Sequence, residues 1–249
     1  MVAPAVHIYM LTEDAGAHAH ATWTALLRRM CRLVDSSCDT QPQAFLVEQP
    51  EEGARKTMAG NQWREKATHR RLVEFWRTVA EQLESSKIVA FHVDADVTWP
   101  AESANVRDVE TIARRRLQNV MEDVLGRTPA EIASRMAFFV PLHPYREIEA
   151  WLFHNVPVLR RICNRRAIAL PACAEAWEAQ PELLDAEPRP KATMPFGADH
   201  NRDLAEDTFP ANRVYELGTS FYHAVEVLKK CAPLRSALKQ TYSAERWQA

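Results

Sequence analysis

The sequence predicts an α/β fold in which a mainly parallel central sheet of about four strands is flanked by helices and followed by a helical C-terminal extension. Short apolar runs alternate along the chain with longer stretches whose apolar residues recur at helical spacing. The apolar runs are unbroken, which is typical of strands buried on both faces of a parallel sheet. This order of elements indicates strands joined by crossover helices on both sides of the sheet.

Each predicted element follows from its own pattern of apolar residues. The predicted strands are residues 5–11, 43–47, 87–93 and 137–142. The helices expected between and after these strands are residues 18–34, 61–84, 106–125 and 147–154.

The pattern changes after the fourth predicted strand and its helix. Residues 1–155 are predicted to form the α/β domain, and residues 156–249 a helical extension packed on it. Within the extension, residues 181–210 are rich in proline and charge and lack periodicity. We expect this segment to be irregular, as a lid, a binding loop or a linker. The helices expected in the extension are residues 157–164, 172–179, 211–231 and 234–242.

Composition limits the kind of protein that this chain can be. Its 249 residues, 47% of them hydrophobic, are enough to bury one good core. The net charge of -2 excludes a global electrostatic signature of nucleic-acid binding, so any such contact must come from a local patch or a partner. The five cysteines show no Cys-x-x-Cys pattern, and neither a signal peptide nor an apolar membrane-spanning run is present. We therefore expect a cytoplasmic protein with no membrane contact.

Acidic residues follow the ends of the predicted strands. Glu13 follows the first strand, and Asp94 and Asp96 follow the third. The carboxyl ends of parallel strands meet at one edge of a sheet, where open α/β folds place their ligands. Clustered carboxylates repel unless a cation lies between them, and magnesium prefers oxygen ligands. These three residues are therefore predicted to meet around a divalent metal ion.

Simpler roles for these acids stay open. Asp94 or Asp96 can cap the turn that follows a strand, and Glu13 can stabilise a helix N-terminus. Two aspartates separated by one residue face the same side of a strand, which capping explains less well. Glu147 and Glu149 open a later helix, where the same dipole effect applies, but Glu149 precedes a bulky apolar run and would need a partner if buried.

Histidines and basic residues offer further candidates. His92 and His143 are expected to be packed side chains, whereas His18 and His20 are candidates for acid-base chemistry or for a softer metal. Runs of basic residues are most simply solvated helix faces, but two or three runs at one edge would form a track for phosphates. These runs are residues 28–29, 69–71, 114–116, 160–161 and 165–166. Candidates for binding the substrate or a developing negative charge are Lys191 and Arg213, with Lys56 and Lys66.

The order of three motifs resembles a known family. They are Leu11-Thr-Glu-Asp14, His92-Val-Asp-Ala-Asp96 and Arg146-Glu-Ile-Glu-Ala-Trp-Leu-Phe153. In this order they are similar to the TOPRIM fold, and most of all to the small TOPRIM proteins related to RloB-like proteins and OLD-family nucleases. The resemblance covers residues 5–155, and residues 209–214 show a weaker similarity. The family usually has a glycine close after its glutamate, whereas this loop continues Asp-Ala-Gly-Ala-His.

The resemblance implies a function. Glu13, Asp94 and Asp96 would coordinate Mg²⁺, for which Mn²⁺ substitutes, during phosphodiester cleavage, and Glu149 would complete the acidic cluster. The implied substrate is nucleic acid, DNA rather than RNA, and the implied context is prokaryotic anti-phage defence. Because the chain lacks a Gly-x-x-x-x-Gly-Lys-Ser/Thr loop, the ATPase of the ABC class that often accompanies such nucleases would be a separate partner. A homo-oligomer is also expected.

Two other functions fit the same residues. The chain could be a non-catalytic subunit that binds or regulates a partner and keeps only the fold. It could also be a phosphohydrolase or nucleotidyl-transfer enzyme that acts on a small molecule with the same carboxylates. Measuring metal uptake distinguishes a non-catalytic subunit from a nuclease. Measuring the range of substrates distinguishes a small-molecule enzyme from a nuclease.

Overall fold

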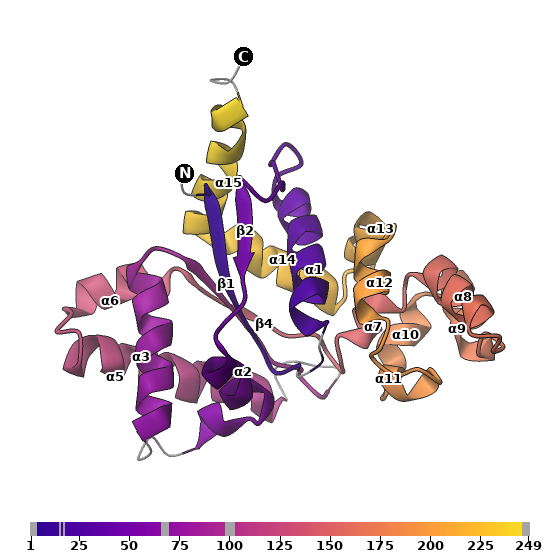
Figure 1. The fold of residues 1–249 in the computed structure, drawn as a ribbon, viewed down its shortest axis with the longest axis horizontal. Helices are drawn as coiled ribbons and strands as arrows, with labels where there is room; N and C mark the ends of the chain where they lie inside the picture. The colour runs from indigo at the N-terminus through magenta and orange to yellow at the C-terminus, as the bar shows by residue number, and fades with distance from the viewer. Residues whose placement is uncertain (1–3, 15, 17, 66–69, 98–102, 246–249) are drawn as a thin grey trace.

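A four-stranded, all-parallel sheet lies at the centre of the protein, which confirms the predicted α/β class (Figure 1). The computed structural model describes residues 4–14, 16, 18–65, 70–97 and 103–245. The strand order is β2-β1-β3-β4, so β1 and β3 are central and β2 is an edge strand. The strands are β1 (Val6–Thr12), β2 (Phe45–Glu48), β3 (Ile88–His92) and β4 (Phe139–Leu142).

Side chains of the two central strands alternate between two buried cores, as expected for strands covered on both faces. Tyr9 and Leu11 of β1 point into one core, together with Phe91 of β3. Ile8 and Met10 of β1 point into the other. The pairing of β1 with β3 extends to Thr12 opposite His92. The residues that follow these two strands therefore leave the sheet side by side.

The first face of the sheet is covered by helices from the middle of the chain, at the left of Figure 1. A continuous helical segment on this face changes from α-helix to one π-helical turn, Val109–Ala113, and back. A 3-10 turn, Gln62–Arg64, precedes the long helix α3. The helices of this face are α2 (Glu52–Ala59), α3 (Arg70–Glu84), α4 (Ala104–Asp108), α5 (Arg114–Asp123) and α6 (Pro129–Met136).

The second face is covered by α1 (Ala19–Val34) and by helices that follow β4. One core joins residues of α1 with residues of the last helices, so the C-terminal extension packs against the sheet through α1 and α14. The remaining helices are α7 (Glu149–Leu152), α8 (Val156–Arg165), α9 (Ala172–Ala179), α10 (Glu182–Ala186), α11 (Pro190–Thr193), α12 (Asn201–Glu206), α13 (Ala211–Glu216), α14 (Ser220–Lys230) and α15 (Ala232–Glu245).

Some predicted boundaries were wrong. Residues 181–210 contain the short helices α10, α11 and α12, separated by turns and coil. These helices were not predicted, because helices of four to six residues are too short to show a period. The predicted helix 211–231 is broken near Gly218, whose φ is +71°, into α13 and α14. The helices α2 and α6 were not predicted, and Gln62–Arg64 form a 3-10 turn where the predicted helix 61–84 was expected to begin. Among the described residues, no helix combines the length and apolar character needed to cross a membrane.

Asn155 connects α12 to the rest of the fold through two hydrogen bonds. Its buried Nδ2 donates to the carbonyl oxygens of Leu204 at 2.9 Å and of Asp207 at 2.6 Å. We expect Asn155→Ala to lower the free energy of unfolding by about 1 to 3 kcal/mol, because these buried carbonyls would lose their donor. Urea unfolding followed by fluorescence measures this loss. Asn164→Ala, at an exposed position on α8, is the control and should change stability by no more than about 0.5 kcal/mol.

Candidate metal centre

The loops after β1 and β3 meet at the carboxyl edge of the sheet. Glu13 follows the last residue of β1 directly, and Asp94 lies two residues beyond the end of β3. The backbone N–H of Asp94 donates to Oε1 of Glu13, which ties the two loops together. The structure therefore brings together two of the three acids that the sequence predicts as metal ligands.

His92 joins this pair of acids. Glu13, His92 and Asp94 each place one ligand atom within 4.8 Å of the others. Within the described part of the chain, these three are the Asp, Glu, His or Cys side chains that lie close enough together to hold a metal ion. Both carboxyl groups supply oxygen atoms, whereas His92 supplies a ring nitrogen.

The contacts of His92 indicate an imidazolium ion. Nε2 lies 3.0 Å from Oδ1 of Asp94, and Nδ1 lies 2.8 Å from the hydroxyl oxygen of Thr12. That hydroxyl donates its proton to Asp14 at 3.2 Å, so it is free to accept from Nδ1–H of His92. Both ring nitrogens thus face an oxygen atom, an arrangement that suits the protonated ring, in which both are donors.

Electrostatics support the same protonation state. Complete burial opposes a charge on His92, but the hydrogen bond and charge of Asp94, with Asp14 and Glu13, outweigh it and raise the pKa of His92 to about 9. The ring also packs against Trp23 at a centroid distance of 4.3 Å. His92 thus serves the acids as a buried cation, a role that the sequence analysis missed, and it also belongs to the group of side chains that could hold a metal ion.

The two acids carry more negative charge than His92 neutralises. Burial raises the pKa of Glu13 to about 7, against the opposing charge of His92. Burial also raises the pKa of Asp94 to about 6, with Asp14 and Glu149 contributing. Asp14 adds a third carboxyl group, held by Thr12 and by the indole N–H of Trp23 at 3.2 Å. A further cation would relieve the repulsion between these carboxylates.

The donor set fits magnesium. Mg²⁺ prefers oxygen ligands, keeps several waters and takes one or two carboxylates from a protein. Glu13 and Asp94 supply such carboxylates from two neighbouring loops. Mn²⁺ accepts the same ligands, whereas the ring nitrogen of His92, once deprotonated, would suit a softer ion such as Zn²⁺.

Asp96 lies outside this group, contrary to the prediction. Its side chain is exposed, and Oδ2 accepts a hydrogen bond of 2.6 Å from Asn105. Strand alternation would place Asp94 and Asp96 on one side, but β3 already ends at His92. The backbone of Asp96 has a φ of +60°, so the chain turns there and points this carboxyl group elsewhere.

Glu149 is a buried neighbour of the centre and does not belong to the group of ligand atoms. It is 2% exposed, and Oε1 accepts a hydrogen bond of 2.8 Å from Nδ2 of Asn201. Burial raises the pKa of Glu149, while the hydrogen bond from Asn201 and the charge of Lys191 oppose this rise. Glu149 thus contributes negative potential from the start of α7. Glu147 instead accepts a hydrogen bond of 3.0 Å from the backbone N–H of Lys191.

The predicted basic residues are divided between different places. Lys191 lies beside Glu149 and lines a pocket that includes Asp14. Arg213 donates instead to the carbonyl oxygen of Glu178 at 2.8 Å. Its predicted contact with a substrate at the acidic centre therefore has no support in the fold. Lys56 forms a 2.5 Å ion pair with Glu52, and Lys66 lies outside the described residues.

The other histidines take separate roles. His143 is packed, as expected, with Nδ1 3.0 Å from the carbonyl oxygen of Val93, and burial lowers its pKa to about 4. His20 lies 3.2 Å from the carbonyl oxygen of Val47, and burial lowers its pKa. His18 lines the pocket that contains Lys191. None of these three belongs to the metal-binding group found among the described residues.

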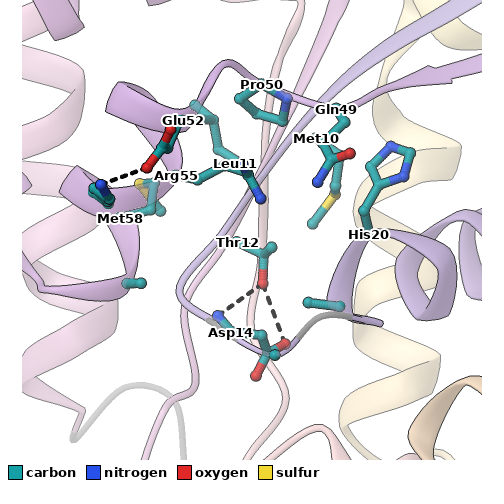
Figure 2. A pocket seen from close by; sticks show the side chains of 14 residues that line it. Met10, Leu11, Thr12, Asp14, His20, Gln49, Pro50, Glu52, Arg55 and Met58 are labelled. Atoms are coloured by element: carbon teal, nitrogen blue, oxygen red, sulfur yellow. Dashed lines mark hydrogen bonds and ion pairs between the residues drawn. The ribbon is translucent and has the colours of Figure 1, made fainter.

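Two pockets are lined by Asp14, the residue that follows Glu13 in the chain. One, of about 230 Å³, is lined by β1, the segment after β2, and α2, and its basic residues are Arg55 and Lys56. Figure 2 shows Thr12 and Asp14 at one end of this pocket, with His20 and Glu52 on opposite sides. The other, of about 460 Å³, lies between the start of α1 and the segment around Lys191. Both pockets therefore reach Asp14, while Glu13 and Asp94 themselves line neither of them.

The raised pKa values predict how stability changes with pH. Glu13, Asp94 and His92 all bind protons more tightly in the folded chain, because their pKa values lie above the ordinary 4.5, 3.8 and 6.5. Their contribution is therefore greatest at low pH and is lost as the pH rises through about 6, 7 and 9.

In the presence of EDTA, the melting temperature should accordingly fall between pH 6 and pH 9, over the range set by these pKa values. Glu13→Gln should flatten the lower part of this decline. Mg²⁺ should raise the melting temperature more at the alkaline end, because it binds the deprotonated acids. Differential scanning fluorimetry measures both curves. A wild-type curve parallel to that of Glu13→Gln would contradict the assignment.

No protein-family model, curated protein or solved structure matches this chain. The fold and the site define a parallel α/β protein with a half-buried acidic centre at the carboxyl edge of its sheet. The TOPRIM relationship rests on the order of the motifs and stays a prediction.

Proposed function

We propose that this chain hydrolyses phosphodiester bonds in nucleic acid with the help of a magnesium ion. One observation carries the proposal: Glu13 and Asp94, far apart in sequence, meet at the carboxyl edge of the sheet with surplus negative charge. Open parallel sheets place their ligands at this edge. The local excess of carboxylates matches a metal ion and its bound phosphate, rather than an anionic substrate alone.

Each residue of the centre has a task in this proposal. Glu13 and Asp94 would hold the ion, and Asp14 would add to the negative field that attracts it. When bound, Mg²⁺ lowers the pKa of a water molecule and polarises the scissile phosphate. His92 fixes the Asp94 carboxylate through its 3.0 Å hydrogen bond. Lys191 lies beside the same centre, where an ammonium group can stabilise negative charge on the phosphate.

Metal binding and cleavage test this proposal together. The full chain should bind Mn²⁺ in calorimetry and cleave labelled DNA or RNA with Mg²⁺ or Mn²⁺ but not with EDTA. Uptake of metal without cleavage of nucleic acid, but with release of phosphate from a small phosphoester, would favour the small-molecule alternative. The pocket of about 230 Å³ beside Asp14 is the observation that favours this second candidate. A chain that binds no metal would be a non-catalytic subunit.

The wider context of the nuclease stays a set of predictions. DNA as the preferred substrate, a separate ABC-class ATPase partner and a role in anti-phage defence rest on the motif resemblance alone. A homo-oligomer belongs to the same set. Purification with and without a co-expressed ATPase tests the partner directly.

A further inference from the structure

We propose that a groove along α1 holds one strand of the nucleic acid and leads it away from the acidic centre. The proposal rests on the proposed function, because it supplies the path of the substrate beyond the bond that is cleaved. The groove is formed by the pocket of Figure 2 and by a second hollow of about 500 Å³ beside α1.

One face of α1 supplies the wall of the second hollow. His20, Thr24, Arg28 and Arg32 all line it and are spaced four residues apart. Residues at this spacing lie above one another on one face of a helix. The facing wall includes Thr40 and Gln41, which precede the edge strand β2. This face of α1 therefore presents two guanidinium groups to a hollow beside the open edge of the sheet.

The two hollows share one lining residue, and the first also reaches a neighbour of the acids in the chain. His20 lines both the pocket of Figure 2 and the second hollow, and Asp14, which follows Glu13 in the chain, lines the first. The helix from Ala19 to Arg32 is roughly 20 Å long at 1.5 Å per residue. At roughly 3.4 Å per stacked nucleotide, this length accommodates about six nucleotides. A small phosphoester would need only the pocket next to the acids.

The guanidinium groups of Arg28 and Arg32 keep their charge available, because Glu206, the acidic residue that lines the same hollow, is paired with Arg202 at 2.9 Å. Neither Arg28 nor Arg32 forms a hydrogen bond or ion pair among the described residues, and the buried Nε of Arg28 has no acceptor there. Arg29, by contrast, donates to the carbonyl oxygens of Ala205 and Glu206 and so holds α12 in place. An oxygen-rich anion would supply the missing acceptors.

Repeated phosphates are the ligand that this arrangement fits. Unpaired guanidinium groups spaced along a groove bind a phosphodiester backbone by charge, without reading its sequence. Arg55, which lines the pocket of Figure 2, extends the positive charge towards the centre. A strand with its scissile phosphate at Glu13 and Asp94 would therefore pass Arg55 first and Arg28 and Arg32 afterwards.

Fluorescence anisotropy with a labelled single-stranded oligonucleotide of roughly 12 nucleotides, in EDTA to prevent cleavage, tests the groove. The double variant R28Q/R32Q keeps most of each side-chain stem and removes both charges. Its affinity should fall roughly 10-fold or more at low salt. The slope of log affinity against log salt should decrease by about 1.4, because each phosphate that an arginine neutralises contributes about 0.7. R28K/R32K should restore binding in part because it keeps the charge.

The matched control is R70Q/R77Q, which removes two arginines that are paired with Glu74 and Glu81 on α3. It should bind the oligonucleotide like the wild type. Equal affinities of R28Q/R32Q and R70Q/R77Q for the oligonucleotide would overturn the proposal that the groove binds nucleic acid. Uptake of Mn²⁺ by R28Q/R32Q should equal that of the wild type, so a failure of the groove is distinct from a failure of the metal centre, which would appear as no Mn²⁺ uptake by the wild type.

Discussion

Replacing Asp94 with asparagine is expected to abolish metal uptake and to lower phosphodiesterase activity by at least about 100-fold, since loss of an outer partner of a metal ligand alone costs 10 to 100-fold. Asp94 contacts both other residues of the centre. It accepts the hydrogen bond of His92 at 3.0 Å, and its backbone N–H holds Glu13. The amide keeps the shape of the carboxylate but offers one neutral oxygen. It also removes the counterion that keeps His92 protonated.

Asp96→Asn is the matched control for this variant. It changes the same residue type two positions away, at an exposed side chain held by Asn105. We expect it to keep metal uptake and most of the activity. Calorimetry with Mn²⁺ and a cleavage assay measure both variants. If Asp96→Asn lost as much as Asp94→Asn, the centre would have three acidic ligands, as the sequence alone predicted. If Asp94→Asn kept full uptake, the assignment of the ligands would be wrong.

Trp151→Ala is expected to give the largest loss of stability, about 3 to 5 kcal/mol. Trp151 lies in α7, two residues after Glu149, and is completely buried. Its indole N–H donates to the hydroxyl of Ser220 at 2.6 Å, and its ring packs edge-on against Phe221 at 5.3 Å. The change would leave a cavity between α7, α1 and α14, and it would remove the donor to the buried Ser220 hydroxyl.

Urea unfolding and thermal melting measure this loss, which corresponds to roughly 2 to 4 °C for each kcal/mol in a chain of this size. Trp151→Phe keeps one aromatic ring but loses the N–H donor and part of the buried volume, so it should cost about 1 to 3 kcal/mol, less than Trp151→Ala. Equal stabilities of Trp151→Ala and the wild type would show that α7 is not anchored through this side chain. The position of Glu149 would then need another explanation.

The sheet could be predicted from the sequence because its strands are continuous apolar runs. The predicted strands 5–11 and 87–93 differ from β1 and β3 by one residue at each end, and the helix α9 lies at its predicted bounds. The short helices α10, α11 and α12 could not be predicted. Helices of this length are held by tertiary packing and capping, not by a period that one segment displays.

The candidate site was predictable only in part. Glu13 and Asp94 could be paired because parallel strands bring their carboxyl ends to one edge. Asp96 was misplaced because strand alternation was extended beyond the end of β3. The charge on His92 depends on Thr12 and Asp14, which come from a different strand and its loop. The sequence signal for this charge was a histidine at the end of a buried strand, followed two positions later by an aspartate.

The central claim is that Glu13 and Asp94 share one divalent ion. A crystal structure of the full chain soaked in Mn²⁺, with anomalous diffraction collected for manganese, tests it most directly. We predict an anomalous peak in contact with carboxylate oxygens of both residues, while Nε2 of His92 still faces Asp94. Manganese bound only elsewhere, or a centre in which His92 alone separates the two carboxylates at saturating Mn²⁺, would contradict the account.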